Sequence, residues 1–362
     1  MNSNKFQFIK SLFVICLTAV LLASCNGKGK NIGLLGDPTS SGRPYEVLVV
    51  ADASFWDRPA GTALYNLLNS SVPGLPQQEP VFDVSRIDPP HYRTTFKLFR
   101  NIITLDIDKN FYTQTRLKYR YDVYAYPQAV LEIHSPSEED LTKFLTYHGQ
   151  EIINFFVKVE MNREAKELEL KHSQLVADMA KQMFGCKLFV PREIGSKKKG
   201  KNFFWASSNS GNASINVCMY AYAYPGPKAF TKKYFVHQRD SFMKANIPGE
   251  EPNMYMKTDT FGLDVHNIVV KRAYAQEARG LWEMENDAMG GPFVSHARVD
   301  TVRNRVVVVE GFVYAPDKLK RTMIRRLEAS LYTLDLPVRS KKITHEVHVG
   351  MPSVSVSAKK TK

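Results

Sequence analysis

The sequence predicts an α+β protein with antiparallel-rich sheets and packed helices. β-branched and aromatic runs bounded by proline or glycine recur in both halves of the chain, as is typical of strands. Between 141 and 183 apolar residues recur at helical spacing. Tyr124-Ala-Tyr-Pro127 recurs as Tyr222-Ala-Tyr-Pro225. We therefore leave open whether two related lobes, joined by the long helical segment, arose by duplication.

The first half is expected to alternate strands with helices. Residues 45–51 form a continuous apolar, β-branched run, which predicts a buried strand. After Asp57, Ala60, Leu64 and Leu68 share one helical face. Aromatic and β-branched content predicts further strands at 81–87, 101–107, 118–126 and 130–134.

The long helical segment begins after Ser135-Pro136, where acidic residues 138–140 favour the positive end of a helix dipole. Gly185 is its expected C-terminal cap. An unbroken helix of about 48 residues would be about 70 Å long. We therefore expect a break near Met161-Asn162, and a single projecting helix is the alternative.

The second half is expected to be mostly strand. Three strands surround a basic loop, and a four-stranded antiparallel meander follows, with a turn at Arg303-Asn304. A helix over 317–332 closes this half. The expected strands cover 186–190, 202–206, 214–224, 265–275, 279–285, 293–301 and 305–314.

The N-terminus predicts export. Lys5 and Lys10 precede an apolar run over 12–22, and small residues follow it, which is the pattern of a secretory signal. The run is about a dozen residues, whereas a membrane-spanning helix needs about 20. Residues 1–24 are therefore predicted to be a signal peptide.

The end of this signal resembles the lipobox of bacterial lipoproteins. Leu22-Ala-Ser-Cys25 places a cysteine where diacylglycerol alkylates the thiol before cleavage. Acyl chains such as palmitate would then anchor the protein, because each buried methylene contributes about 0.8 kcal/mol. An ordinary secretory signal with a chance cysteine is the alternative. The expected organisation is a signal peptide (1–24), a flexible tether (25–44), an N-terminal αβ lobe ending in the long helical segment (45–184), a C-terminal meander-plus-helix lobe (185–337) and a basic, disordered tail (338–362).

The chain is strongly basic. Its formal net charge is +13, and removal of Lys5 and Lys10 with the signal lowers it to +11. Such a charge inside a cell would suggest nucleic acid, but export argues against that partner. The membrane, an envelope protein and anionic lipids or polymers remain as partners, and a merely well-solvated surface is favoured over these.

Two cysteines remain after the signal and the lipidation site. Cys186 and Cys218 would pair as a disulfide in an oxidising compartment. They are equally suited to be small buried hydrophobic residues. The sequence leaves both interpretations open.

The sequence offers only weak candidates for catalytic, cofactor-binding or metal-binding motifs. No Gly-x-Ser-x-Gly elbow or Cys-x-x-Cys is present, and no cofactor is expected. His345-Glu-Val-His348 has its histidines three apart in an alternating stretch, whereas a metalloprotease helix needs them four apart. We therefore predict no metal site.

Two stretches are candidate binding sites. The basic run 197–201, followed by Trp205, would dock on an anionic membrane or stack on a sugar. A solvated hairpin loop is favoured there. Glu283 and Glu285 would face a cation from one side of a strand whose Trp282 faces the core, although a solvated face is favoured. The candidate residues are Lys197, Lys198, Lys199, Lys201, Trp205, Trp282, Glu283 and Glu285.

The mature chain resembles an uncharacterised lipoprotein family of Bacteroidetes, the domain of unknown function 4837. The residues that carry the resemblance are Gly42-Arg-Pro-Tyr-Glu-Val-Leu-Val-Val50, Gly74-Leu-Pro-Gln77, Phe82-Asp-Val84 and Arg100-Asn-Ile102. It implies an envelope lipoprotein and carries no activity. In lipoproteins of that phylum, acidic residues after the acylated cysteine favour surface display. Asn26-Gly-Lys-Gly-Lys30 has none, which favours the outer membrane with the protein facing the periplasm.

The function expected from these observations is non-catalytic binding or scaffolding by a membrane-anchored envelope lipoprotein. The alternative is an envelope-acting enzyme of the hydrolase type whose catalytic residues are dispersed in the sequence.

Overall fold

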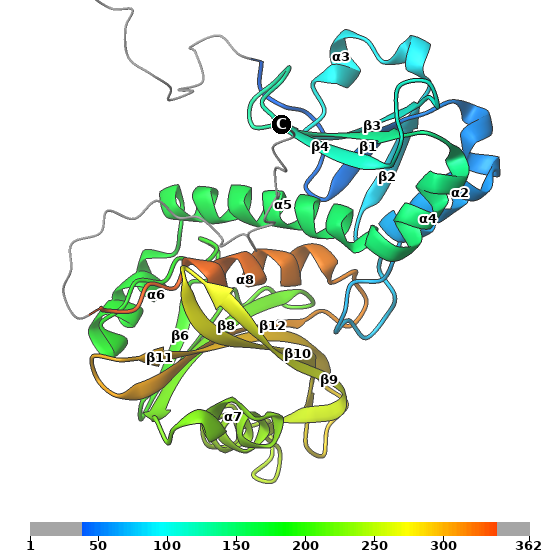
Figure 1. Ribbon diagram of the computed structural model, residues 1–362. Helices are drawn as coiled ribbons and strands as arrows, with labels where there is room; N and C mark the ends of the chain where they lie inside the picture. Colours follow the sequence, from blue (N-terminus) through cyan, green and yellow to red (C-terminus); the bar gives the residue numbers. More distant parts are fainter. Residues whose placement is uncertain (1–37, 339–362) are drawn as a thin grey trace, which may run out of the picture. The chain divides into compact units, whose positions relative to one another are not determined.

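The computed structural model describes residues 38–338 and confirms the α+β fold class (Figure 1). It contains a five-stranded sheet of order β2-β1-β3-β5-β4 and a seven-stranded sheet of order β6-β7-β8-β12-β11-β10-β9. No helix in the described part is long and apolar enough to cross a membrane. The expected signal peptide, Cys25, His345-Glu-Val-His348 and the tail from 339 onward lie outside the described residues.

The first sheet is mostly parallel, which differs from the antiparallel pairing expected. β1 pairs in parallel with β2 and β3, and β3 pairs in parallel with β5; only β4 runs antiparallel, at the edge. All five residues of β1 are buried, as is typical of a parallel strand covered on both faces. The strands are β1 (Glu46–Val50), β2 (Asp83–Ile87), β3 (Asn101–Ile107), β4 (Arg116–Tyr121) and β5 (Ala129–Ser135).

Residues 39–41, expected in the flexible tether, are part of this fold. Thr39 forms an isolated parallel bridge with Tyr126, and Ser41 forms another with Phe99. The chain therefore joins the first sheet before β1 begins.

The long helical segment breaks at places other than the one expected. α5 runs through Met161 and Asn162 without interruption, so the break predicted there is wrong. Gly149 separates α4 from α5, and Ser173 caps α6 by accepting the N–H of Val176 at 3.4 Å. Gly185 is the expected left-handed cap, with φ of 63°. The elements of this half are η1 (Ala53–Asp57), α2 (Pro59–Leu68), η2 (Pro89–His91), α3 (Thr94–Lys97), α4 (Glu138–His148), α5 (Gln150–Leu170), α6 (Gln174–Met179) and the π-helical turn η3 (Ala180–Phe184).

The second sheet is wholly antiparallel, and a four-stranded antiparallel meander is present as β9 to β12. The bounds of its first two strands were predicted wrongly, because the turn between β9 and β10 lies at residues 271–272, inside the strand expected at 265–275. The strand expected at 186–190 is only a single bridge between Lys187 and Asp335. Helix α7 was not predicted from the sequence. The elements are β6 (Ser196–Gly200), β7 (Phe203–Ser207), β8 (Ser214–Ala223), η4 (Pro227–Phe230), α7 (Lys232–Asn246), β9 (Met256–Val270), β10 (Ala273–Met284), β11 (Gly290–Asp300), β12 (Arg305–Tyr314) and α8 (Arg321–Thr333).

This sheet carries a core on each face. Along β12, Val307 and Val309 pack with Leu327 of α8, whereas Val308 packs with Met243 of α7 on the opposite face. The two sheets differ in strand direction and order. The tetrapeptide Tyr-Ala-Tyr-Pro, which occurs at 124–127 and again at 222–225, therefore does not reflect a repeated fold.

Helix α8 lies between the seven-stranded sheet and α5 (Figure 1). Met161 and Leu168 of α5 pack with Ala329 of α8 in a small apolar cluster. Arg326 of α8 donates to Glu164 of α5 at 3.3 Å. These contacts bring polar side chains of both helices together at the start of β1.

Candidate functional site: a polar cleft between α5 and α8

A cavity of about 180 Å³ opens where α5 and α8 meet the start of β1. Pro44 and Tyr45 form its wall at β1, and Thr322 lies on the α8 side. The rest of the lining is charged. The charged residues are Arg100, Arg163, Arg325 and Arg326, together with Glu160, Glu164 and Glu167.

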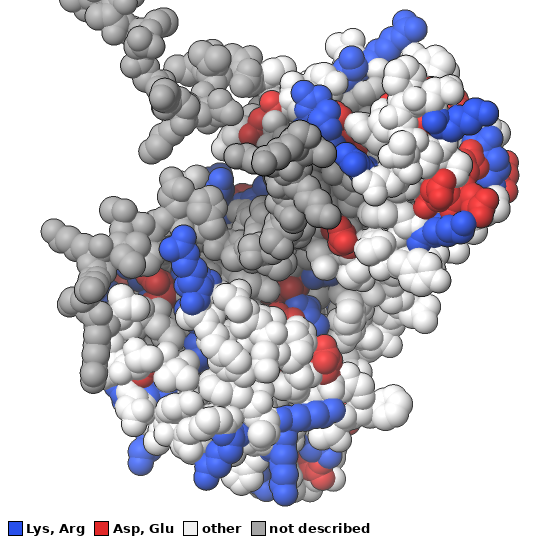
Figure 2. All heavy atoms as spheres, in the orientation of Figure 1, with Lys and Arg blue, Asp and Glu red and all other residues white. Residues whose placement is uncertain are grey.

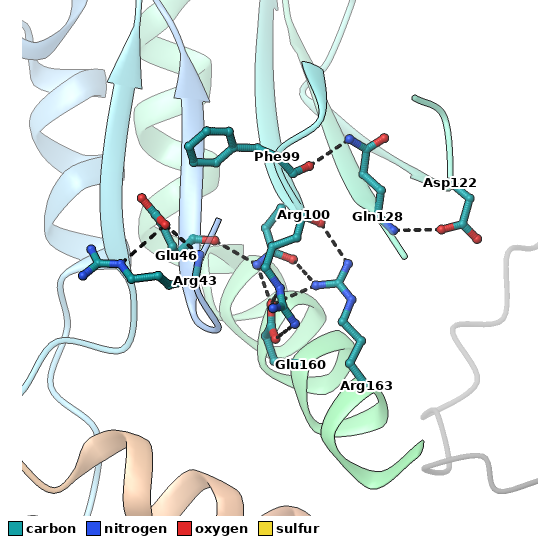
Figure 3. A network of polar contacts seen from close by, with 9 residues as sticks. Arg43, Glu46, Phe99, Arg100, Asp122, Gln128, Glu160 and Arg163 are labelled. Atoms are coloured by element: carbon teal, nitrogen blue, oxygen red, sulfur yellow. Dashed lines mark hydrogen bonds and ion pairs between the residues drawn. The ribbon is translucent and has the colours of Figure 1, made fainter. Parts of the chain in front are cut away.

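Glu160 is the central residue on the side of the cavity that α5 forms (Figure 3). Its carboxylate is 2% exposed and accepts Arg100 Nη2 at 2.7 Å, Arg163 Nη1 at 2.8 Å and Asn101 Nδ2 at 2.7 Å. Asn101 also donates to the backbone oxygen of Glu46 at 2.9 Å. A buried carboxylate is tolerated when charged donors saturate it, as here. The network fixes α5 against the first residues of β1 and β3.

Tyr45 is held in an unusual conformation beside this wall. Its φ is 59°, in the left-handed region that bulky residues rarely adopt. The ring stacks on Phe82 with centroids 6.5 Å apart, and the Glu46 N–H donates to the Arg43 oxygen at 3.1 Å, which closes the turn. Backbone strain of this kind is often found at functional sites.

Two buried donors lining the cleft have no hydrogen-bond partner among the described residues. They are the Tyr45 hydroxyl and Arg325 Nε. Burial raises the pKa of Tyr45 further above its usual 10, so the hydroxyl keeps its proton at neutral pH. The Arg325 guanidinium carbon lies 5.6 Å from the centroid of the Tyr45 ring. An unsatisfied buried donor costs about 1–3 kcal/mol.

A second polar array lies beneath α8 and is joined to the cleft through Glu328. Glu328 accepts Arg325 Nη1 at 2.9 Å and Arg279 Nη1 at 3.2 Å. Arg279 Nε donates to Glu277 at 2.9 Å, and the other Glu277 oxygen is 3.0 Å from His296 Nε2. Burial raises the pKa of Glu277, but Arg279 and His296 outweigh it and hold the pKa well below 4.5. The array therefore anchors α8 to the sheet with an ionised carboxylate.

The predicted basic run does not form a loop. Lys197, Lys198 and Lys199 lie in β6, at the edge of the second sheet, and alternate between its two faces. Trp205 of β7 is opposite Lys198, and its indole donates to Asn216 at 3.0 Å. Lysines on an edge strand disfavour pairing with another strand. Lys201 lies in the β6–β7 turn.

The predicted acidic pair binds a lysine. Lys257 Nζ lies 3.0 Å from Glu283 and 2.5 Å from Glu285. Trp282 is buried and donates to the Val313 oxygen at 3.1 Å. Among residues 38–338, no group of three His, Cys, Asp or Glu side chains is placed to hold a metal ion.

The two cysteines are free and buried, so the disulfide interpretation is wrong for this structure. Cys186 belongs to the core on the α8 face of the second sheet, and Cys218 belongs to the core on the α7 face. Burial raises the pKa of Cys186 to about 12. Both behave as small apolar core residues.

Charge is not concentrated in one area of the surface drawn in Figure 2. Acidic and basic side chains are interspersed there. This view favours specific polar sites, such as the cleft, over a broad basic surface.

The sequence analysis did not predict the residues of the cleft. Glu160, Glu164 and Glu167 recur at i, i+4 and i+7, which indicates one acidic face on an otherwise amphipathic helix. That spacing was a usable signal. Tyr45 and Arg325 gave no such signal in the sequence, because Tyr45 lies in a stretch typical of a buried strand and Arg325 in one typical of a helix surface.

Two family models match the chain. Residues 173–333 match the domain of unknown function 4837, and residues 40–169 match the domain of unknown function 8532. The motifs that suggested the first family, among them Gly42–Val50, lie within the second match. A search of the curated proteins found no match. The cleft combines residues of both matched regions, since Tyr45 and Glu160 lie in one and Arg325 in the other.

Proposed function

We propose that the protein, whose residues 173–333 match the domain of unknown function 4837, is a non-catalytic binding protein, anchored in the cell envelope by lipid on Cys25. The family assigns no activity, so the proposal rests on sites and not on the fold. Two observations support it, one for the anchor and one for the binding.

The anchor is supported by the N-terminal sequence. A basic start, a short apolar run and Leu22-Ala-Ser-Cys25 together match what lipidation at a cysteine requires. The absence of acidic residues from Asn26 to Lys30 supports the outer membrane, with the protein facing the periplasm. Two or three acyl chains hold a protein at a bilayer stably, whereas a single chain binds only reversibly.

The binding function is supported by the charged lining of the cleft, together with two unpartnered donors of residues that line it. The Tyr45 hydroxyl and Arg325 Nε both require an acceptor, and carboxylate or phosphate oxygens are the acceptors that a charged donor binds most strongly. A volume of about 180 Å³ corresponds to about six water molecules. The cleft therefore fits a small anionic group or the end of a larger ligand.

The glutamates of α5 restrict the ligand further. Glu164 and Glu167 line the same cavity, and within residues 38–338 the side chain that binds Glu164 is Arg326, at 3.3 Å. A second negative charge on the ligand would meet these carboxylates at close range. We therefore expect one anionic group joined to a neutral or cationic remainder.

The hydrolase alternative has no specific observation in its favour. His296, the buried histidine of the described part, is tied to Glu277 beneath α8 and does not line the cleft. The charged groups of the cleft are arginines and glutamates largely engaged with one another, an arrangement suited to holding a ligand in place.

Calorimetric titration of the Cys25→Ala chain with inorganic phosphate and with acetate tests the binding site. Tyr45→Phe removes one donor and keeps the ring, and we expect it to weaken binding about tenfold. Tyr220→Phe is the matched control, because the Tyr220 hydroxyl is also buried without a partner but lies on the α7 face of the second sheet. Absence of binding at millimolar concentration, or an equal loss in the control, would overturn the proposal.

A further inference from the structure

Three segments lie side by side where the described chain begins. Ser40 N–H donates to the Tyr126 oxygen at 3.1 Å, and Ser41 N–H donates to the Leu98 oxygen at 2.8 Å. Residues 39–41 therefore lie between the segment around α3 and the loop that leads into β5.

Gln128 fixes the two outer segments to each other (Figure 3). It is 1% exposed, and its Nε2 donates to the backbone oxygens of Lys97 at 2.6 Å and Phe99 at 2.8 Å. Its Oε1 accepts the Tyr124 N–H at 2.9 Å, and its own N–H donates to Asp122 at 2.8 Å. The side chains that these segments expose are thus displayed on a fixed backbone.

The exposed side chains are aromatic and basic, and we call this surface the aromatic patch. Phe96 is 42% exposed, Tyr124 39% and Tyr126 48%. Lys97 Nζ lies 5.2 Å from the centroid of the Tyr124 ring and 5.7 Å from that of Tyr92. The patch consists of the exposed Arg93, Phe96, Tyr124 and Tyr126 and the half-buried Tyr92 and Lys97.

This chemistry fits the surface of a bilayer. Tyrosine places an apolar ring and a polar tip at the depth where lipid headgroups meet acyl chains. Lysine and arginine beside such rings gain about 1 kcal/mol each near anionic headgroups. Asp122, an acidic residue in the loop of this patch, accepts the Gln128 N–H at 2.8 Å.

The position of the anchor selects the membrane as the partner. Thirteen residues separate Cys25 from Thr39, and a chain of that length spans at most about 50 Å. A protein held so close to a bilayer needs only a weak additional contact to adopt one orientation, because tethering makes the encounter intramolecular. We propose that the aromatic patch docks on the bilayer that carries the Cys25 acyl chains. The inference rests on the lipidation proposed above.

Spin labelling of the lipidated protein in phosphatidylethanolamine–phosphatidylglycerol vesicles tests the docking. Cys186 and Cys218 are buried and the Cys25 thiol is alkylated, so an introduced cysteine is labelled selectively. We expect a nitroxide at Phe96→Cys to gain at least threefold in its oxygen-to-nickel collision ratio on vesicles. Tyr126→Cys is a second probe of the same patch, should the first variant fold poorly.

Phe111→Cys is the matched control. Phe111 is 80% exposed and follows the far end of β3, about 20 Å from the patch along the strand. On vesicles, the oxygen-to-nickel collision ratio of its nitroxide should be the same as in free solution. If the patch and control labels respond alike on a lipidated, vesicle-bound protein, the docking is overturned and the anchor stands. If the protein is found to carry no acyl chains, both the docking and the anchor are overturned.

Discussion

Glu79 caps helix α8 from the opposite half of the sequence: its Oε1 accepts the backbone N–H of Lys320, 241 positions away, at 2.7 Å. Its other oxygen accepts the N–H of Arg321 at 2.8 Å. The first N–H groups of a helix have no partner within the helix, and a carboxylate there also meets the positive end of the helix dipole. The first half of the chain thereby completes the helix that forms one side of the cleft.

Replacing this cap should destabilise the whole protein. Glu79 is 2% exposed, so Glu79→Gln would lose the charge at a site that solvent does not screen. We expect the free energy of unfolding to fall by about 1–2 kcal/mol, measured by urea denaturation. Glu139→Gln is the control, because its side chain is 78% exposed and pairs only with Lys143 on the same helix. Equal effects of the two variants would contradict the capping role.

Stability should decline in acid partly because of Glu277. Burial alone would raise the pKa of Glu277, but Arg279 and His296 hold it below the usual 4.5 in the folded protein. The unfolded chain therefore binds more protons as the pH falls below about 4.5, and the stabilisation present above that pH is lost progressively.

The variant Glu277→Gln isolates this contribution. At pH 6 it should be less stable than the unmodified protein by about 3 kcal/mol, because Arg279 and His296 lose a charged partner. As the pH falls from 5 to 3, the difference should narrow. Urea unfolding at several pH values measures it. A difference that stays constant over this range would show that folding does not lower the pKa of Glu277.

Both remaining cysteines should behave as buried thiols. The pKa of Cys186 is raised to about 12 and that of Cys218 well above 9, in each case by burial, so neither forms a thiolate at neutral pH. A thiol reagent should leave a folded chain that lacks residues 1–25, and with them Cys16 and Cys25, unlabelled. In denaturant without reductant it should label two thiols. Failure to label the denatured chain would reveal a disulfide.

Much of the fold followed from local pattern. Val47, Val49 and their neighbours read as a buried strand because the run is apolar at every position. Gly185 read as a helix cap because a left-handed residue ends the helix there. In both cases the signal lies within a few consecutive residues.

Features that depend on distant contacts were not predicted. Helix α7 was not predicted, and it packs on the sheet through Arg239, a charged residue that is fully buried in an ion pair with Glu310 at 2.8 Å. The break expected at Met161 was misplaced because packing of that residue with Ala329 of α8 favours a continuous helix. The cleft itself depends on Tyr45 and Arg325, which are 280 positions apart in the sequence and meet only in the fold.

The anchor is the central claim, and the mass of the mature N-terminal peptide tests it most directly. Mass spectrometry of protein extracted from native membranes should find Cys25 as the first residue, bearing diacylglycerol on its sulfur. In parallel, Cys25→Ala should move the protein from the membrane pellet to the soluble fraction. An unmodified Cys25 thiol, or a peptide that still contains residues before Cys25, would contradict the account.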